Sequence, residues 1–175
     1  KDSLLKIRDT DRYKDSMDRV RNRLKIRDVI LGYTYQQTKN KFKITLPGIL
    51  TDAAQYNTVE GFNLSYKFSA NKVYEDLKGY TVQGKVRYGF ANYLWGGELG
   101  FNYLYKPKRF SSFGIKLKSI AEQFNRQEPI MPILNTIYTL FENENYMKLF
   151  KESGVELNYF SELTNGIYFS GNLQY

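Results

Sequence analysis

The chain has 175 residues, with 26 lysines and arginines against 18 acidic residues, and a formal charge of +8. It contains no histidine and no cysteine, which excludes a histidine metal site, a zinc–thiolate site, a Ser-His-Asp triad and a cysteine nucleophile. We therefore expect no catalytic residues, no metal and no cofactor, and we expect that the protein is not an enzyme.

The first predicted element is a charged helix within residues 1–28, a segment rich in both basic and acidic side chains. Four apolar residues there follow helical spacing: Tyr13, Met17, Val20 and Leu24. They predict an amphipathic helix over about 11–25. Because acids alternate with bases, we favour a solvated linker helix over a docking or membrane-surface helix.

After residue 28 the apolar pattern changes from a helical period to strict alternation, which is typical of β-strands. The alternating segments are 29–35, 42–46, 62–69, 80–88, 95–105, 113–117, 155–159 and 167–175. Short turns join most of them, among them Asn165-Gly166, a pair that suits a tight hairpin. The sequence therefore predicts a mainly β unit over 29–175, an antiparallel meander of about eight strands.

Alternation leaves open which face of the sheet is covered. A soluble barrel turns its apolar face inward, around a core or an apolar ligand, whereas a membrane barrel turns it to lipid and keeps a polar lumen. Aromatic residues gather near the predicted strand ends, where they would form girdles at the two membrane interfaces. The candidate girdle residues are Tyr33, Tyr35, Tyr80, Tyr88, Trp95, Tyr103 and Tyr105.

The opposite face of the predicted strands carries a mixed polar and charged set that suits a wet interior. The candidate lumen-facing residues are Lys67, Gln83, Lys85, Arg87, Glu98, Asn102, Lys116, Lys118, Glu156 and Asn158. Two interpretations stay open for the five cations among them. They form a lumen that attracts anions, or they are balanced by Glu98 and Glu156. Since the basic residues alternate along strands instead of clustering, we expect no nucleic-acid binding.

A short polar motif precedes the most regular strand: Asn57, Thr58, Glu60 and Gly61. Glu60 is predicted to be a buried acceptor that fixes the preceding connection, and Gly61 to supply backbone angles that other residues avoid. A ligand-binding role for Glu60 is the alternative, and we favour the structural one.

One connection, 119–153, is too long for a barrel turn and contains Pro129 and Pro132. Its apolar content is high for a free loop, and the spacing predicts a helix over about 135–148. We expect this segment to pack against the sheet, either plugging a lumen or capping one mouth. The alternative is a loop that rests its apolar face on lipid headgroups.

Several segments resemble the large Bacteroidota-type outer-membrane proteins in which a carboxypeptidase-regulatory-like domain precedes a β-barrel. The matching segments are 1–4, 13–18, 32–35, 56–62, 144–150 and 162–166. They follow in order across nearly the whole chain, and the Asn-Thr-Val-Glu-Gly motif is fairly specific. The family is uncharacterised and its members are several times longer, so the resemblance implies a fragment that covers the barrel entry and first strands.

The resemblance implies part or all of a transmembrane β-barrel in the bacterial outer membrane. We therefore expect a non-enzymatic barrel that acts in transport or as a scaffold, with lipid and other subunits of an outer-membrane complex as partners. The alternative from a different class is a soluble β-barrel that binds an apolar ligand.

Overall fold

The computed structural model describes residues 10–48, 54–125, 127 and 129–175. The predicted unit 1–28 is therefore described only from residue 10, and the resemblance at 1–4 lies outside the described residues. The helices are α2 (Asp11–Arg21), α3 (Ile26–Leu31) and α4 (Pro132–Phe141), and η2 (Pro107–Arg109) is a short 3-10 turn. Among the described residues no helix is long and apolar enough to cross a membrane.

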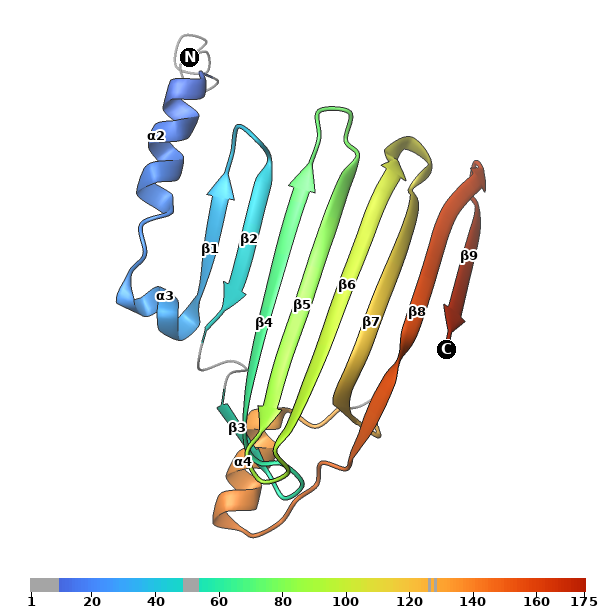
Figure 1. Cartoon of the computed structure of the whole chain (residues 1–175). Helices are drawn as coiled ribbons and strands as arrows, with labels where there is room; N and C mark the ends of the chain where they lie inside the picture. The colour runs from blue at the N-terminus through green and yellow to red at the C-terminus, as the bar shows by residue number, and fades with distance from the viewer. Residues whose placement is uncertain (1–9, 49–53, 126, 128) are drawn as a thin grey trace.

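Nine antiparallel strands form one sheet (Figure 1), which confirms the predicted antiparallel meander and adds one strand to the expected eight. The strands are β1 (Gly32–Gln37), β2 (Phe42–Pro47), β3 (Ala54–Asn57), β4 (Gly61–Val73), β5 (Gly79–Gly89), β6 (Leu94–Lys106), β7 (Ser111–Gln123), β8 (Leu149–Thr164) and β9 (Ile167–Gln174). The order is β1-β2-β4-β5-β6-β7-β8-β9, so in the described chain β1 and β9 are the two edges of an open sheet.

The extra strand, β3, was not predicted because it has only four residues, too few to show alternation. It pairs with the lower part of β4, from Ala54 opposite Leu64 to Asn57 opposite Gly61. The upper part of β4 pairs with β2 instead, as in Thr45 opposite Ser69. Together β2 and β3 therefore occupy one edge of β4 at two different levels.

The N-terminal helix ends earlier than predicted, and the predicted start of the first strand is wrong. α2 stops at Arg21 and not near residue 25, and residues 29–31 belong to α3 and not to a strand. The carboxylate of Asp28 accepts a hydrogen bond from the backbone N–H of Lys25 (2.9 Å), which satisfies a free N–H at the start of α3. This cap favours a helix where alternation alone predicted a strand.

The segment after α2 covers the free edge of β1. The side chain of Asn22 donates to the carbonyl of Gln36 (2.7 Å) and accepts from its N–H (3.0 Å). These are the two bonds that a neighbouring strand would make. Asp18, which is buried, accepts from the N–H of Thr38. Side chains of the N-terminal segment thus satisfy part of an edge that is otherwise a template for pairing.

The long connection is shorter than predicted. β7 continues to Gln123 and β8 begins at Leu149, so only residues 124–148 lie between the two strands. The helix is α4, which ends at Phe141, whereas the sequence predicted a helix to about residue 148. It ends because Asn143 adopts a positive φ of 57° and the chain turns back toward α4. The predicted helical character of this connection is confirmed.

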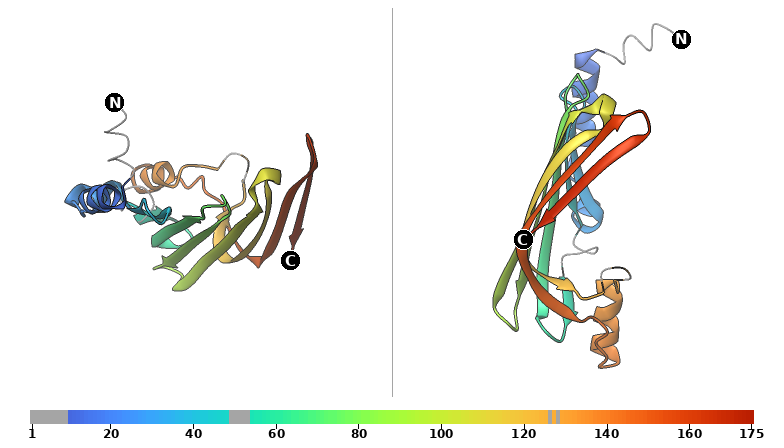
Figure 2. Two further views of the ribbon diagram at one scale, coloured as in Figure 1. Left: turned by 90° about the horizontal axis from the view of Figure 1, so that it is seen from above. Right: turned by 90° about the vertical axis from the view of Figure 1, so that its right-hand side faces the viewer.

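The sheet is curved, and α4 lies on its inner side at the lower end (Figure 2). Along β4 the polar side chains are buried and the apolar ones are exposed, which is the reverse of the pattern in a sheet of a soluble protein. Asn63 and Ser65 are 0% and 3% exposed, whereas their neighbours Leu64 and Tyr66 are 51% and 49% exposed. Ile120 and Met147 are the buried apolar residues of the described chain, against eleven that are polar or charged. The described chain has a polar interior and an apolar outer face.

Candidate functional site

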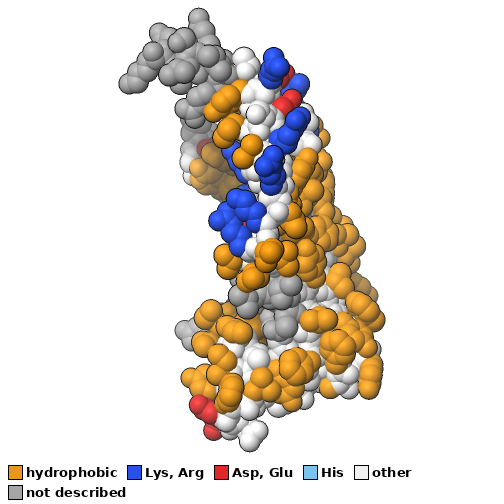
Figure 3. Space-filling view, turned by 90° about the vertical axis from the view of Figure 1, so that its left-hand side faces the viewer, with side chains coloured by type: hydrophobic (Ala, Val, Ile, Leu, Met, Phe, Trp, Pro, Cys, Tyr) orange, Lys and Arg blue, Asp and Glu red, His pale blue; other side chains and the backbone are white. Residues whose placement is uncertain are grey.

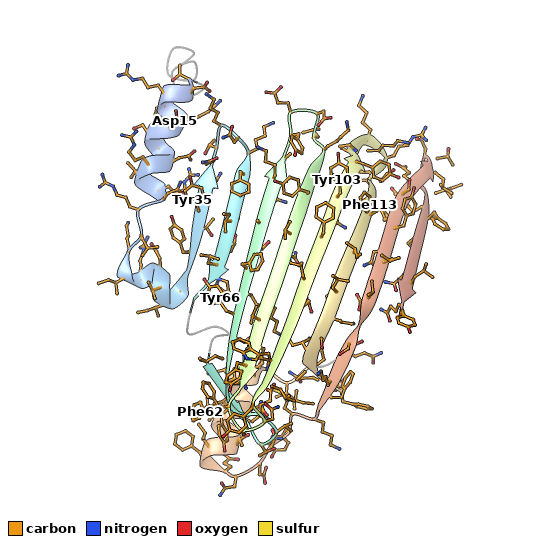
Figure 4. All side chains as sticks on the ribbon, viewed as in Figure 1. Asp15, Tyr35, Phe62, Tyr66, Tyr103 and Phe113 are labelled. Atoms are coloured by element: carbon orange, nitrogen blue, oxygen red, sulfur yellow. The ribbon has the colours of Figure 1, made fainter. Side chains whose placement is uncertain are left out.

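The apolar face of the sheet has an aromatic row near its upper end. Tyr80 lies directly opposite Tyr103, Tyr103 opposite Phe113, and Phe113 opposite Tyr159, so four strands each contribute one ring. The rings of Tyr103 and Phe113 are 5.8 Å apart between centroids, and the hydroxyls of Tyr105 and Tyr159 are 2.8 Å apart. Tyr103 and Phe113 are labelled in Figure 4. We call these residues the upper aromatic row.

A second aromatic cluster lies near the lower end of the same face. Tyr88 is directly opposite Trp95, with ring centroids 4.8 Å apart, and Phe90 packs edge-on against Tyr88 at 5.0 Å. Trp95 is 70% exposed. Phe62 at the lower end of β4 packs against Tyr56 of β3 at 5.2 Å. We call Tyr88, Phe90 and Trp95 the lower aromatic row.

The two aromatic rows lie at opposite ends of the apolar face, with a band of mostly aliphatic residues between them. Tyr80 and Tyr88 are eight residues apart on β5, which is about 26 Å along a strand at about 3.3 Å per residue. A strand tilt of about 40° reduces this height to about 20 Å, close to the apolar band of about 25 Å in membrane barrels. Between the rows the outward residues are mostly aliphatic, such as Val82, Val86 and Leu99.

The space beside Gly84 in this band is occupied by the ring of Phe68. A Cβ atom on Gly84 would lie 2.2 Å from the ring of Phe68, directly across on β4. The ring of Phe68 therefore covers Gly84. Hydrophobic side chains are gathered along one border of the molecule, beside the basic residues of the N-terminal helix (Figure 3).

The candidate girdle residues fall into three groups. Tyr80, Tyr103 and Tyr105 belong to the upper row, and Tyr88 and Trp95 to the lower row. Two others lie at neither end of the band. Tyr33 is opposite Leu46, and its hydroxyl donates to the carbonyl of Asn22 (2.7 Å). Tyr35 is opposite Ile44 and accepts from the side chain of Gln37 (2.9 Å).

The polar face carries the candidate lumen residues in rows across the strands. Lys67 is opposite Lys85, Lys85 opposite Glu98, and Glu98 opposite Lys118. Gln83 and Lys116 lie in the next row, and Asn102 and Asn158 in the one above it. One face of the sheet therefore brings all of these side chains together, as the alternation of the sequence requires.

Ion pairs neutralise most of the charges on the polar face. Lys118 pairs with Glu156 and, at 2.8 Å, with Glu152, and Lys116 pairs with Glu98 at 3.3 Å. The partner of Arg87 is not one of the two acids named from the sequence. It is Glu60, from the polar motif that precedes β4.

The polar motif forms a buried turn beneath the sheet. The Nε of Arg87 lies 3.0 Å from both carboxylate oxygens of Glu60, and both residues are buried. Asn57 orients Glu60: its amide donates to the carboxylate (3.0 Å), and its side-chain oxygen accepts from the N–H of Glu60 (2.8 Å). Gly61 has a φ of 64° and passes 2.9 Å from Ala91, measured from an added Cβ. The motif thus fixes the start of β4 to β5.

A second buried network joins α4 to this turn, and no pattern in the sequence predicted it. Asn135 is fully buried, and its side-chain oxygen accepts from the N–H groups of Tyr146 and Met147, each at 3.0 Å. Its amide donates to Asn145 (2.8 Å), and Asn145 donates to Thr58 (2.7 Å). Asn135 lies within a largely apolar segment, and its partners Tyr146 and Met147 approach it only because the chain after α4 turns back toward the helix.

Two cavities lie at the covered lower end. One, of about 150 Å³, is mostly apolar and contains Trp95, Ile120 and Phe150 in its wall, with the Glu60–Arg87 pair on one side. The other, of about 80 Å³, lies between the polar face and α4, and its wall contains Ser65, Lys67 and Lys85. Ser65 is one of the buried residues whose side chain has no hydrogen-bond partner in the described chain.

Comparison with known proteins identifies the family of the chain. A model of the C-terminal domain of a family of unknown function, DUF5686, matches residues 27–175. The chain belongs to the DUF5686 family. No curated protein and no solved structure matches it.

The DUF5686 match covers all nine strands and α4, and leaves α2 outside. The two aromatic rows, the polar face and the buried turn thus all lie within the matched domain. The expectation that the chain belongs to an uncharacterised family is confirmed. The match carries no activity, so the function has to be argued from the geometry above.

Proposed function

We propose that this DUF5686 domain is a wall of a β-barrel in the bacterial outer membrane, with no enzymatic activity, that serves transport or acts as a scaffold. The observation that carries the proposal is the inverted burial of the sheet. Half-exposed Leu64 and Tyr66 alternate with fully covered Asn63 and Ser65 along one strand. Water disfavours such an outer face, whereas lipid favours it.

Three further features support this orientation. The exposed band ends in an aromatic row on each side, as at the two interfaces of a membrane. The inner side of the curved sheet carries charges that are mostly paired. A soluble barrel around an apolar ligand would need the opposite curvature, with Leu99 and Val86 facing inward.

The position of α4 favours a cap over a plug. α4 packs on β3 at the lower end of the sheet, where Thr136 accepts from the N–H of Tyr56 (3.0 Å). It therefore narrows one mouth of the proposed barrel and leaves the middle of the polar face open. We propose lipid as the surrounding partner, with other subunits of an outer-membrane complex at the two sheet edges, and no nucleic acid.

The single tryptophan of the chain allows a direct test. We would refold the protein into vesicles whose lipids carry bromine at defined depths, and measure the fluorescence of Trp95. Bromine near the headgroup should quench Trp95 most strongly, because the lower aromatic row lies at the interface in the proposal. Its emission should also shift to shorter wavelengths relative to the unfolded chain.

Two variants provide matched controls in the same strands. Trp95→Phe combined with Leu99→Trp moves the probe to the middle of the apolar band, where bromine near the chain ends should quench best. Trp95→Phe combined with Gln83→Trp moves it to the polar face, where quenching should be weak at every depth. Equal quenching of the Leu99 and Gln83 probes, or none for either, would refute the proposed orientation.

A further inference from the structure

An open basic groove lies at the upper end of the sheet, beside the N-terminal helix. Its volume is about 500 Å³. Its wall is formed by α2, by the turn between β1 and β2, and by the upper end of β4 with the turn that follows it. The charged residues of the wall are the lysines Lys14, Lys39, Lys41 and Lys72 and the acids Asp11 and Glu75. Within the described residues, the wall therefore carries more positive than negative charge.

The two acids do not neutralise this groove. Asp11 pairs with Lys39, with 2.9 Å between the ammonium nitrogen and the carboxylate. The other acid, Glu75, shares the wall with Lys41 and Lys72, which come from two neighbouring turns of the sheet. An anion that approaches the upper end from this side is therefore attracted.

Lys72 belongs by its register to the upper aromatic row. It lies directly opposite Tyr80 of β5 and, on its other side, opposite Phe42 of β2. Its ammonium group lies over the ring of Tyr74, 5.7 Å from the centroid. Tyr74 follows the upper end of β4 (Figure 1), so the side chain of Lys72 extends away from the apolar band. A lysine at the border of a lipid-facing surface extends its ammonium group toward the headgroups in this way.

A second lysine at the upper end has a similar arrangement. The ammonium group of Lys106, the last residue of β6, lies 5.7 Å from the ring centroid of Tyr105 in the upper aromatic row. The turn that follows contains Lys108 and Arg109, which are both exposed. Basic side chains therefore continue along the upper end, just beyond the aromatic row.

We propose that the upper end of the sheet binds the phosphate groups of anionic lipid headgroups, with the groove at Lys41 and Lys72 as the main contact. This inference rests on the proposed function, because it requires the apolar band to lie in the hydrocarbon layer. The carbonyl of Lys41 accepts from the N–H of Val73 (3.0 Å), which holds the first turn beside the end of β4. Two ammonium groups can therefore act on one headgroup at the level where the apolar band ends.

The test uses a tryptophan opposite Lys72 and two brominated lipids. We would combine Trp95→Phe with Tyr80→Trp and refold the chain into vesicles of equal parts phosphatidylcholine and phosphatidylglycerol, with bromine on one lipid at a time. The ratio of the two quenching constants measures which headgroup is enriched beside residue 80. We expect brominated phosphatidylglycerol to quench about threefold more strongly, since each lysine near an anionic surface contributes up to about fivefold.

Variants in the same background locate the contact. Lys72→Gln should reduce the preference for phosphatidylglycerol by about half or more, and Lys41→Gln should reduce it less. Lys72→Arg keeps the charge and should keep the preference. Lys151→Gln is the matched control, because it removes a lysine from the lower part of β8, opposite Ala121, and should leave the preference at residue 80 unchanged. Lys41→Gln keeps the test decisive if Lys72→Gln does not refold.

The outcomes separate this inference from the proposed function. Equal quenching by the two lipids would refute the headgroup contact and leave the membrane orientation standing, whereas quenching by neither would refute both. An equal loss of preference in Lys151→Gln would mean that total charge, and not the groove, attracts the lipid. Inorganic phosphate at constant ionic strength should not change the preference. If phosphate abolishes it, the groove binds a free anion and the proposal is wrong.

Discussion

The lower end of the polar face and the middle of the apolar face differ in what surrounds their side chains. At the lower end, several buried polar groups find partners within the chain, as in the Glu60–Arg87 pair and the Asn135 network. In the middle of the apolar face, Leu99 and Val86 remain half exposed, and no other layer of the described chain covers them. The first region is stabilised mostly by groups of the chain itself, although the side chains of Asn63 and Ser65 have no hydrogen-bond partner in the described chain. The second would be favoured by the apolar surrounding that we propose.

This difference separates two sources of stability. Changes at the lower end should act in any solvent, because the partners are protein groups. Changes in the apolar band should act through the surrounding medium. The following variants test this distinction, from the largest expected effect to the smallest.

Glu60→Gln should have the largest effect, because it leaves the guanidinium of Arg87 buried without a counter-charge. We expect a loss of about 3–5 kcal/mol in the free energy of unfolding, measured by urea titration. The loss should be similar in detergent and in vesicles. Asp76→Asn is the control, since it breaks an exposed pair with Lys78 and should cause no measurable change. Equal stability of the two variants would mean that the buried pair does not hold the turn.

Leu99→Arg places a charge at the centre of the apolar band. If this face meets lipid, the variant should lose about 2–4 kcal/mol of stability in vesicles, measured by urea unfolding. Asn102→Arg puts the same side chain on the exposed polar face of the same strand and should change stability by about 0.5 kcal/mol or less. Similar losses for the two variants would argue against a lipid-facing sheet.

Asn135→Ala removes the acceptor of two backbone N–H groups and leaves them buried. We expect a loss of about 1–3 kcal/mol, together with faster hydrogen exchange at Tyr146 and Met147. Asn172→Ala, at an exposed asparagine pair on β9, is the control and should leave both measurements unchanged. If exchange at these two amides stays slow, another group holds the returning segment.

The pair between Asp11 and Lys39 should have the smallest effect. The hydrogen bond and charge of Lys39 hold the pKa of the Asp11 carboxyl below its ordinary value of about 3.9. The small stability that this gives is present at neutral pH and is lost as the pH falls through the lowered pKa. Lys39→Gln should return the pKa of Asp11 to its ordinary value in an NMR titration. An unchanged pKa would mean that the pair does not form in solution.

Strand positions were predictable because alternation is local. The faces of β4, β5 and β6 follow from the even or odd position of each residue, as in Tyr80, Gln83 and Arg87. The boundaries were less predictable, because they depend on caps. Residues 29–31 alternate like a strand, but Asp28 caps a helix there. The strand β3 exists because β4 offers an edge, not because its own four residues favour one.

The sequence by itself determined which residues share a face of the sheet, because a period of two assigns every side chain once a strand is formed. It also determined that histidine and cysteine chemistry is absent. Only the tertiary structure decided that Glu60 meets Arg87, 27 positions away, and that Pro132 of α4 lines the same cavity as Ser65 and Lys85. The physical reason is that ion pairs and cavities depend on distances across the fold, which no local pattern encodes.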